Sequence, residues 1–519
     1  MIIYRSPYPD VSIPDVSITE YVLEHASDHP ERVAFVDGDR RTTYAELADA
    51  IGRTAGGLAR SGIGRGDVVA LVAANVMEYA LVFHGTTSLG AVVTTVNPTY
   101  GAEEVRFQLQ DAGAVLLVVA AAFLPTAREA IAGTAVREIL VIGPDGAPGD
   151  LAAGERSFFS LLEADPRPPV AVEPDHVAVL PYSSGTTGLP KGVMLTHRNL
   201  VANLAQVAVQ VAVGDDEVAI AVLPFFHIYG MQVIMNDGLR RGVTLVTMPR
   251  FDLTQFLALV QRHRVTRAYV VPPIVLALAK HPSVDDYDLT SVRSLFSGAA
   301  PLGAEVAEEA ALRVGAPVVQ GYGMTELSPV THATALDDRV PGSIGTLVPN
   351  AEARVVDPET GADLDVGGTG ELWLRGPMVM KGYLNRPDAT AETIDPDGWL
   401  HTGDIGHVDE RGHWYISDRM KELIKVKGFQ VPPAELEALL VTHPAVADAA
   451  VIGIPDDKAG ELPKAFVALK PGSEASAEEL QAFVAGHVAT YKQIRLVEFV
   501  AEIPKSASGK ILRRMLRDR

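Results

Sequence analysis

Short apolar runs that alternate with longer helix-like stretches are the feature that most limits the fold of this 519-residue chain. Runs of this kind, rich in Val and Ala, cover residues 68–73, 114–119, 177–180 and 243–247. Such runs suit buried strands, and their alternation with helices is typical of βα units. The chain is therefore predicted to be an α/β protein with mainly parallel sheets.

Local residue chemistry marks the start of one helix and one linker. Thr43-Tyr-Ala-Glu46 matches a capping box, and apolar periodicity continues through Leu47, Ile51 and Leu58. A helix is therefore predicted to begin after Thr43. Residues 166–169, Pro-Arg-Pro-Pro, are predicted to form a linker before the next strand.

The pattern of elements changes after Arg419. The predicted elements beyond it are a helix over 433–441, strands over 447–453 and 464–469, and a helix over 477–488. This order is typical of a small α+β domain. We predict a large N-terminal domain, 1–418, and a small C-terminal domain, 419–519. Between them lies a charged Asp-Arg-Met-Lys segment whose polar residues suit a hinge.

Composition excludes several classes of function and location. The net charge of −21, from 44 Lys and Arg against 65 Asp and Glu, argues against nonspecific binding to nucleic acid or anionic lipid. The absence of cysteine excludes disulfides and thiolate chemistry and agrees with a reducing cytoplasm. The N-terminal segment is unlike a signal peptide, apolar runs such as 115–123 are too short to span a bilayer, and residues 516–519 are no peroxisomal address. We predict a cytoplasmic protein without a membrane span; composition leaves the oligomeric state open.

A Gly- and Thr-rich segment at 182–192 follows the apolar run 177–180 and precedes a predicted helix that opens at 196–200. Backbone N–H groups, hydroxyls and the Lys191 ammonium can together hold a polyphosphate. A surface turn is the alternative interpretation. The segment does not match the Walker pattern, because Gly192 follows the lysine where Ser or Thr is required, which disfavours a P-loop kinase or GTPase.

Two further motifs have both a local and a functional interpretation. Residues 321–326, Gly-Tyr-Gly-Met-Thr-Glu, follow the apolar pair Val318-Val319. Glycines at a strand end allow a nucleotide to approach the backbone, although a tight strand exit also explains them. Asp404 lies in a predicted hairpin with its turn at 410–412, where a surface ion pair with Arg419 is the local alternative.

Basic residues near the C-terminus and one histidine are ambiguous when each is taken alone. The lysines within 421–427 precede Gly428 and have the pattern of a solvated face. Lys510 lies close to the C-terminus, where an isolated segment is expected to fray. His227, within Pro-Phe-Phe-His-Ile-Tyr-Gly at 224–230, is by itself more typical of a structural histidine.

Seven motifs occur in order along the chain: SSGTTGLPKGV (183–193), PFFHIYG (224–230), SGAAPL (297–302), QGYGMTE (320–326), WLHTGD (399–404), DRMKELIKVKGFQV (418–431) and SGKILRR (508–514). Together they resemble the adenylate-forming superfamily of acyl-CoA synthetases, nonribosomal-peptide adenylation domains and luciferases. The 4-coumarate:CoA ligase-like branch is the most similar. The resemblance spans nearly the whole chain, and chance agreement at all seven motifs is negligible.

The resemblance implies ATP and coenzyme A as co-substrates, Mg²⁺ as cofactor, and a small-molecule carboxylic acid as the third substrate. The implied ATP and AMP ligands are Ser183, Ser184, Gly185, Thr186, Thr187, Gly188, Lys191, Gln320, Gly321, Tyr322, Thr325, Asp404, Arg419 and Lys510. Among them, Gln320 to Tyr322 would frame adenine, and Asp404 and Arg419 would hold the ribose hydroxyls. Glu326 would hold magnesium, which favours one carboxylate together with phosphate oxygens.

The remaining roles are also implied by the resemblance. The acyl site would be lined by His227, Tyr229, Ser297, Gly298, Ala299, Gly323, Pro329 and Val330. Coenzyme A would meet Arg250, Lys427 and Gly428. The residues implied to act in catalysis are Lys510, Lys425, His227, Thr325 and Glu326. Lys421 would be the hinge.

The implied reaction has two steps. The acid's carboxylate attacks the α-phosphorus of ATP and displaces pyrophosphate, with Lys510 and the Thr186-Thr187-Lys191 loop stabilising charge. The coenzyme A thiol then attacks the acyl-adenylate and AMP leaves. Rotation about Lys421 would exchange Lys510 for Lys425 between the two steps.

The acid substrate is less sharply defined than the reaction. The branch implies 4-coumarate or a related hydroxycinnamate, and His227 argues against amino acids, which typically meet an Asp. Leu327-Ser328 replaces the Ala-Gly of many plant hydroxycinnamate ligases, and Phe296 stands where several have Lys. Medium-chain fatty acids and other aryl acids are alternatives, as are a luciferase-like oxidase and a carrier-protein-loading enzyme. A non-catalytic nucleotide-binding relative is disfavoured because both Lys425 and Lys510 are present.

Overall fold

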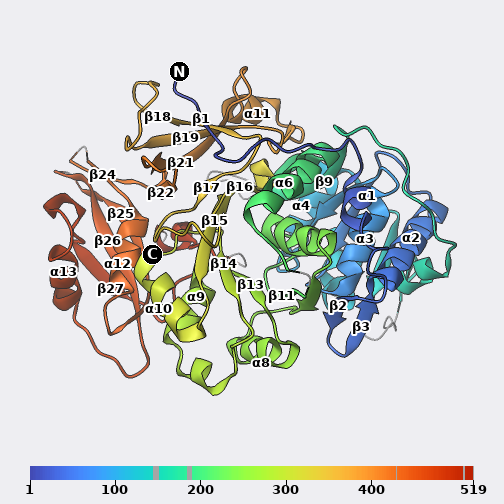
Figure 1. Ribbon diagram of the computed structural model, residues 1–519, viewed down its shortest axis with the longest axis horizontal. Coiled ribbons are helices and arrows are strands. Elements are labelled where there is room, and N and C mark those ends of the chain that lie inside the picture. The colour runs from blue at the N-terminus through green and yellow to red at the C-terminus, as the bar shows by residue number, and fades with distance from the viewer. Residues whose placement is uncertain are drawn as a thin grey trace.

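The computed structural model describes residues 1–143, 151–183, 190–214, 216–427, 429–456, 458–506 and 509–517. Within these ranges the strands form four sheets with helices packed around them (Figure 1). Two of the sheets are mainly parallel, so the predicted α/β class is confirmed. None of the described helices is long and apolar enough to cross a membrane.

The first sheet contains three of the four predicted apolar runs. Its order is β20 (Gly382–Tyr383), β10 (Lys191–Thr196), β9 (Val177–Ser183), β5 (Val92–Thr95), β4 (Val68–Val72), β6 (Ala114–Ala120), β7 (Glu138–Ile142) and β8 (Glu155–Ser157). Pairing is parallel from β9 to β8, whereas β10 is antiparallel to both β9 and β20.

A strand that was not predicted, β10, lies between the Gly-rich segment and the predicted helix. Val193 and Leu195 alternate as fully buried side chains along this strand. That two-residue period places them in the core and makes β10 the partner of β9. The predicted helix then follows as α6 (His197–Gln210), capped by Thr196.

The second sheet contains the fourth predicted run, which forms β12. Its order is β17 (Thr346–Leu347), β16 (Val330–Ala333), β15 (Val318–Gly323), β14 (Ser294–Ser297), β13 (Arg267–Val270), β11 (Val218–Ala221), β12 (Thr244–Thr247), β2 (Val33–Asp37) and β3 (Arg40–Thr43). Pairing is parallel from β15 to β2 and antiparallel at both ends.

The third sheet is antiparallel throughout, which the βα rhythm did not predict. Its order is β1 (Tyr4–Arg5), β18 (Glu352–Val356), β19 (Gly370–Arg375), β21 (Leu400–Val408) and β22 (Trp414–Arg419). The chain returns to this sheet from its N-terminus, because β1 pairs with β18. The predicted hairpin around 410–412 is confirmed as β21 and β22.

The fourth sheet is built from the segment after β22. Its strands are β24 (Phe429–Val431), β23 (Ile424–Val426), β26 (Gly460–Leu469), β25 (Val446–Asp456) and β27 (Leu496–Phe499). It has apolar clusters of its own, including Val431, Leu436, Val451 and Val467. The strands and helices predicted here are present, although β25 and β26 are longer and α13 is shorter than expected. The division at residue 418 remains a prediction.

The helices cover the sheets and connect their strands (Figure 1). The α-helices are α1 (Ile18–Leu23), α2 (Tyr44–Arg60), α3 (Met77–Thr87), α4 (Ala102–Ala112), α5 (Leu124–Ala130), α6, α7 (Asp237–Arg240), α8 (Leu253–His263), α9 (Pro272–Lys280), α10 (Ala304–Val314), α11 (Pro387–Thr393), α12 (Pro433–Leu440), α13 (Ala477–Ala485) and α14 (Arg513–Arg517). The 3₁₀-helices are η1 (Ala121–Phe123), η3 (Phe158–Glu163), η5 (Pro282–Asp286), η6 (Thr325–Leu327) and η7 (Thr490–Lys492), and η4 (Tyr229–Asn236) is a π-helix.

The predicted capping box at α2 is confirmed. The Thr43 hydroxyl accepts a hydrogen bond from the Glu46 backbone N–H at 3.2 Å, and the Glu46 carboxylate accepts one from the Thr43 N–H at 2.8 Å. Two N–H groups that a free helix end would leave without partners are thereby satisfied.

Candidate active site

The candidate site lies where several parallel strands of the second sheet end. Residues 320–323 form the last part of β15, residues 298–299 follow β14, and residues 224–230 follow β11 by a short connection. Carboxyl ends of parallel strands meet at one edge of a sheet, which is where ligands bind in open α/β folds. The topology therefore gathers motifs that are far apart in the sequence.

Two glycines of these motifs occupy positions with no room for a side chain. A Cβ at Gly323 would lie 2.0 Å from the carbonyl oxygen of Pro329, and a Cβ at Gly298 would lie 3.0 Å from the Tyr229 ring. Gly323 thus allows β15 to approach Pro329, and Gly298 allows the Tyr229 ring to approach the chain after β14. Both residues are needed for the shape of the predicted acyl region.

Glu326 is a buried carboxylate held by two hydroxyl groups. Its Oε1 accepts hydrogen bonds from the Ser183 hydroxyl at 3.0 Å and from the Tyr383 hydroxyl at 2.9 Å. The Lys191 ammonium lies 4.8 Å from the centre of the Tyr383 ring. Ser183 and Lys191 flank the Gly-rich segment, so the structure joins that segment to Glu326. Tyr383 was not predicted as a site residue, because it stands outside all seven motifs.

Asp404 and Arg419 face each other on the hairpin of β21 and β22, where they are register partners. Arg419 Nε lies 3.5 Å from Asp404 Oδ1, and the Tyr322 hydroxyl donates to Asp404 Oδ2 at 2.5 Å. Burial raises the pKa of Asp404, and Arg419 opposes that rise. Because Asp404 is buried and bonded to Tyr322 of β15, a simple surface ion pair does not describe this group.

Lys510 lies among these groups rather than at a frayed end. Burial and the nearby Arg419 charge lower its pKa to about 8, against the opposite influence of the Glu326 and Asp404 carboxylates. Burial also lowers the pKa of His227 to about 3, with Lys510 adding to that effect. A neutral histidine therefore lies within electrostatic reach of the partly buried Lys510 ammonium.

Gly509, the residue before Lys510, packs closely against the side chain of Val271. Gly509 has φ of +80°, and a Cβ there would lie 3.0 Å from the side chain of Val271. Val271 precedes α9. The loop therefore packs directly on the second sheet's connections, and a side chain at 509 would hold it away.

A small pocket beside His227 corresponds to the predicted acyl region. Its lining residues are Leu223, Pro224, His227, Tyr229, Gly230, Val271 and Ala299. The Tyr229 hydroxyl donates to the Phe296 carbonyl oxygen at 3.0 Å, which fixes the ring at the pocket wall. Tyr229 also begins the π-helix η4, an irregularity that is frequent at functional sites.

Of the other predicted acyl residues, Gly298 lies against the Tyr229 ring of this pocket, and the rest are not among its lining residues. Ser297 and Val330 are buried, and Asn203 donates to the Val330 carbonyl oxygen at 2.7 Å. Leu223 and Val271 line the pocket but were not predicted. Their apolar character gives no signal, because only the fold brings them to His227.

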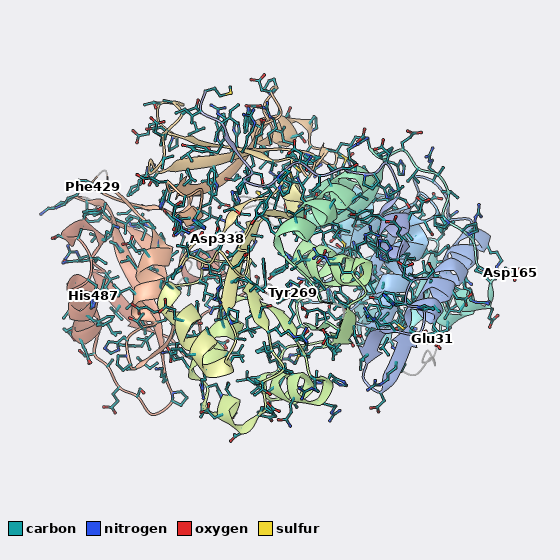
Figure 2. All side chains as sticks on the ribbon, viewed as in Figure 1. Glu31, Asp165, Tyr269, Asp338, Phe429 and His487 are labelled. Atoms are coloured by element: carbon teal, nitrogen blue, oxygen red, sulfur yellow. The ribbon has the colours of Figure 1, made fainter. Side chains whose placement is uncertain are left out.

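The predicted coenzyme A and hinge residues lie apart from the Lys510 cluster. Arg250, Lys421, Lys425 and Lys427 are exposed. Backbone N–H groups of Lys425 and Lys427 bond to Glu461 and Ala459 of the fourth sheet's hairpin region. The exposed Phe429 follows them at the outer edge of that sheet (Figure 2). The structure therefore brings Lys510 to the site, and leaves Lys425 and Lys427 away from it. The predicted site residues Ser184 to Gly188 and Gly428 lie outside the described residues.

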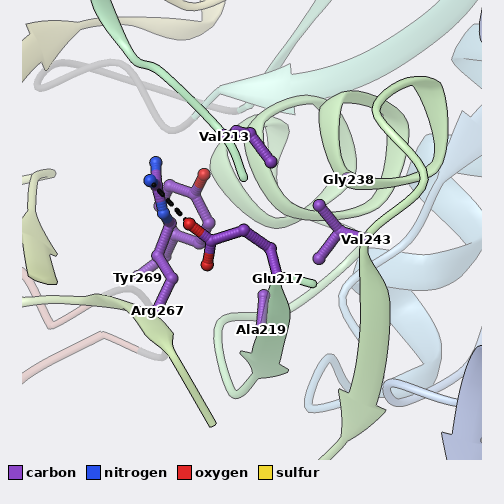
Figure 3. A pocket seen from close by; sticks show the side chains of 7 residues that line it. All are labelled: Val213, Glu217, Ala219, Gly238, Val243, Arg267 and Tyr269. Carbon is purple, nitrogen blue, oxygen red and sulfur yellow. Dashed lines mark hydrogen bonds and ion pairs between the residues drawn. The ribbon is translucent and has the colours of Figure 1, made fainter. Parts of the chain in front are cut away.

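A second pocket lies behind the acyl region and contains a buried ion pair (Figure 3). Its lining residues are Val213, Glu217, Ala219, Gly238, Val243, Arg267 and Tyr269. The Arg267 guanidinium lies 3.2 Å from Glu217 Oε1, and both side chains are almost fully buried. The Tyr269 ring meets the Tyr229 ring edge-on, with centroids 6.5 Å apart. Tyr269 therefore packs against the tyrosine that lines the acyl pocket.

Comparison with known proteins agrees with this geometry. Residues 22–384 match the model of the AMP-binding enzyme family, and residues 435–510 match the AMP-binding enzyme C-terminal domain. Solved structures with the same fold include an anthranilate CoA ligase in complex with anthranoyl-AMP, with TM-score 0.92, 27% identity and 98% of each chain covered. ATP-bound MatB from Rhodopseudomonas palustris has TM-score 0.89 at 30% identity, covering 97% of this chain and 99% of that one. The chain therefore belongs to the AMP-binding enzyme family.

Particular relatives are similar along their whole length. 4-Coumarate–CoA ligase 3 of Oryza sativa subsp. japonica is 45% identical over 533 aligned residues, which cover 100% of this chain and 95% of the relative. The 4-coumarate–CoA ligase of Pinus taeda is 46% identical over 534 aligned residues, which cover 100% of this chain and 97% of the relative.

Proposed function

We propose that this chain is an AMP-forming acyl-CoA ligase that converts 4-coumarate or a related hydroxycinnamate, ATP and coenzyme A into the acyl-CoA thioester, AMP and pyrophosphate. The observation that carries the proposal is the convergence of Lys510, Glu326, Asp404 and Arg419 beside the His227 pocket. Identities of 45% and 46% to two 4-coumarate–CoA ligases support the substrate class.

In the first step the substrate carboxylate attacks the α-phosphorus of ATP, and the bond to pyrophosphate breaks. Lys510 supplies positive charge close to the reacting oxygens, where a preorganised cation is most effective. Asp404 accepts hydrogen bonds from ribose hydroxyls, with Arg419 beside it as donor. The neutral His227 borders the acyl pocket without adding a charge that would compete for the carboxylate.

Magnesium fits the residues that surround Glu326. Among the described residues, the hydrogen bonds to this carboxylate go to Oε1, from Ser183 and Tyr383, which orients Oε2 for a cation. Mg²⁺ prefers one or two carboxylates together with substrate phosphates. When bound, it would neutralise charge on the polyphosphate, and Thr325, adjacent to Glu326, would meet the α-phosphate.

In the second step the coenzyme A thiol attacks the adenylate carbonyl and AMP leaves. We assign Lys427, Gly428 and Arg250 to coenzyme A and Lys425 to the adenylate. Lys425 and Lys427 lie on an exposed face, so this assignment requires rotation of the C-terminal segment about Lys421. The exchange would remove Lys510 once adenylation is complete.

The test is release of AMP that depends on coenzyme A, measured with a panel of carboxylic acids. 4-Coumarate and its hydroxylated relatives are expected to give the highest kcat/KM, α-amino acids no turnover, and Lys510→Ala a strong loss with every acid. Higher kcat/KM for a medium-chain fatty acid would overturn the hydroxycinnamate assignment. Light emission with luciferin and oxygen, or acylation of a carrier protein but not of free coenzyme A, would overturn the ligase assignment.

One observation favours other acids as a second candidate class. Apart from His227, the pocket lining is apolar, and the Tyr229 hydroxyl is already bonded to the Phe296 carbonyl oxygen. Such a lining also suits an unsubstituted aryl acid or a medium-chain acid, because neither brings a ring hydroxyl that needs a partner. The panel therefore includes cinnamate, benzoate and hexanoate.

A further inference from the structure

Asp418 lies at the end of β22, before the proposed hinge, but its side chain bonds to a residue beyond that hinge. Its Oδ2 accepts a hydrogen bond from the backbone N–H of Ala434 at 2.8 Å. Its Oδ1 accepts one from the Arg419 N–H at 2.7 Å, and the residue is 5% exposed. The carboxylate is therefore buried at the junction between the two parts of the chain.

Ala434 lies in the first turn of α12, whose leading N–H groups have no partner inside the helix. The N-cap residue, Pro432, makes no side-chain capping bond. Asp418 takes that role from across the junction, and its negative charge lies at the helix end where the helix dipole favours an anion. This carboxylate is thus a direct hydrogen-bonded contact between β22 and α12.

α12 is in turn tied to the segment that carries Lys510. Arg513, at the start of α14, donates to both carboxylate oxygens of Glu437 on α12, each at 2.8 Å. The Arg513 guanidinium also lies close enough to Asp418 to counter the rise in the Asp418 pKa that burial causes. One buried cluster therefore joins β22, α12 and the segment just after Lys510.

We propose that Asp418 is a positioning residue for the adenylation step, which holds α12 and, through Arg513, the Lys510 loop in the orientation that faces Glu326. The inference rests on the proposed function, because it assigns Lys510 to adenylation. Asp418 precedes Lys421, whereas α12, Arg513 and Lys510 follow it. Rotation about Lys421 therefore breaks the Asp418–Ala434 hydrogen bond, and the contact stabilises the adenylation orientation relative to the rotated one.

The first test separates the half-reactions in single-turnover experiments with Asp418→Ala and Asp418→Asn. Loss of a hydrogen bond to a charged group should slow adenylation by on the order of tenfold in Asp418→Ala. Asp418→Asn keeps an acceptor oxygen and should lose less. Thioester formation from supplied acyl-AMP should stay within about twofold of the parent chain, since that step needs the rotated orientation.

The matched control is Ser476→Ala. Ser476 caps α13 by accepting from the Glu479 N–H at 3.0 Å, a contact made wholly beyond the hinge. Its loss removes a helix cap without removing a contact across the junction, so the ratio of the half-reaction rates should not change. Equal slowing of both half-reactions in Asp418→Ala would overturn the proposal.

A second readout needs no catalysis. An ideal Cβ at Gly303 lies 3.4 Å from the Ala438 Cβ, so cysteines at these two positions can form a disulfide only when α12 is docked. Adding Asp418→Ala to this pair should slow disulfide closure by about tenfold, and adding Ser476→Ala should not. Unchanged closure would overturn the positioning role. If the parent chain forms no acyl-adenylate, the proposed function fails, while the closure rate still reports on Asp418.

Discussion

A disulfide between Gly303→Cys and Ala438→Cys should trap the orientation in which Lys510 faces Glu326. Gly303 caps α10 with φ of −63°, a value open to any residue, and Ala438 is a half-buried residue of α12. The 3.4 Å separation of the two Cβ positions is close to that of natural disulfides, which lie near 3.5–4.5 Å. The chain has no cysteine of its own, so no other disulfide can form.

The size of the effect follows from the loop that the bond closes. A loop of about 135 residues corresponds to about 5 kcal/mol of stabilisation in the chain-entropy relation. For activity, the oxidised protein can still adenylate its acid but cannot rotate about Lys421. Adenylation should stay within about twofold, and thioester formation should fall about tenfold when about nine-tenths of the molecules are cross-linked.

The assay measures each half-reaction before and after oxidation, with the cross-linked fraction read from non-reducing gel electrophoresis. Reduction should restore thioester formation, and each single-cysteine variant should behave like the parent in both states. Thioester formation at the parent rate in fully oxidised protein would refute the argument, because the rotation would then be unnecessary. Loss of adenylation on oxidation would show that the docked orientation is not the adenylating one.

The remaining predictions concern single residues. Lys510→Ala should slow adenylation by about 10²- to 10³-fold and spare thioester formation from supplied acyl-AMP, whereas Lys425→Ala should do the reverse. Equal slowing of both steps by both variants would contradict this division. The adenylation kcat/KM for ATP should fall as pH rises through about 8, because Lys510 loses its charge there. The kcat/KM of Lys510→Arg should not change over that range. A parent pH profile that matches the Lys510→Arg profile would contradict the prediction. Glu217→Ala should lower the free energy of unfolding by about 3–5 kcal/mol, since it leaves Arg267 buried without its partner carboxylate; a urea-denaturation loss below about 1 kcal/mol would argue against it.

Much of the fold could be predicted because local patterns carried the necessary information. The apolar runs became β4, β6, β9 and β12 because they are too short for a typical buried helix and are rich in β-branched Val. The capping box at Thr43 worked because its hydrogen bonds join residues three apart. β10 was missed because its two-residue alternation is short and is stabilised by pairing with β9 and β20, which local patterns do not reveal.

The candidate site divides in the same way. The sequence by itself determined which residue types were available, and the motif around Glu326 was recognisable because its glycines and carboxylate are adjacent. Only the tertiary structure decided that Tyr383 bonds to Glu326, that Val271 seats Gly509, and that Asp418 bonds to Ala434. Each of these contacts joins segments whose proximity depends on strand order and on the packing of α12. Strand order and helix packing depend on the burial of apolar surface over the whole chain, and that total cannot be inferred from any single short segment.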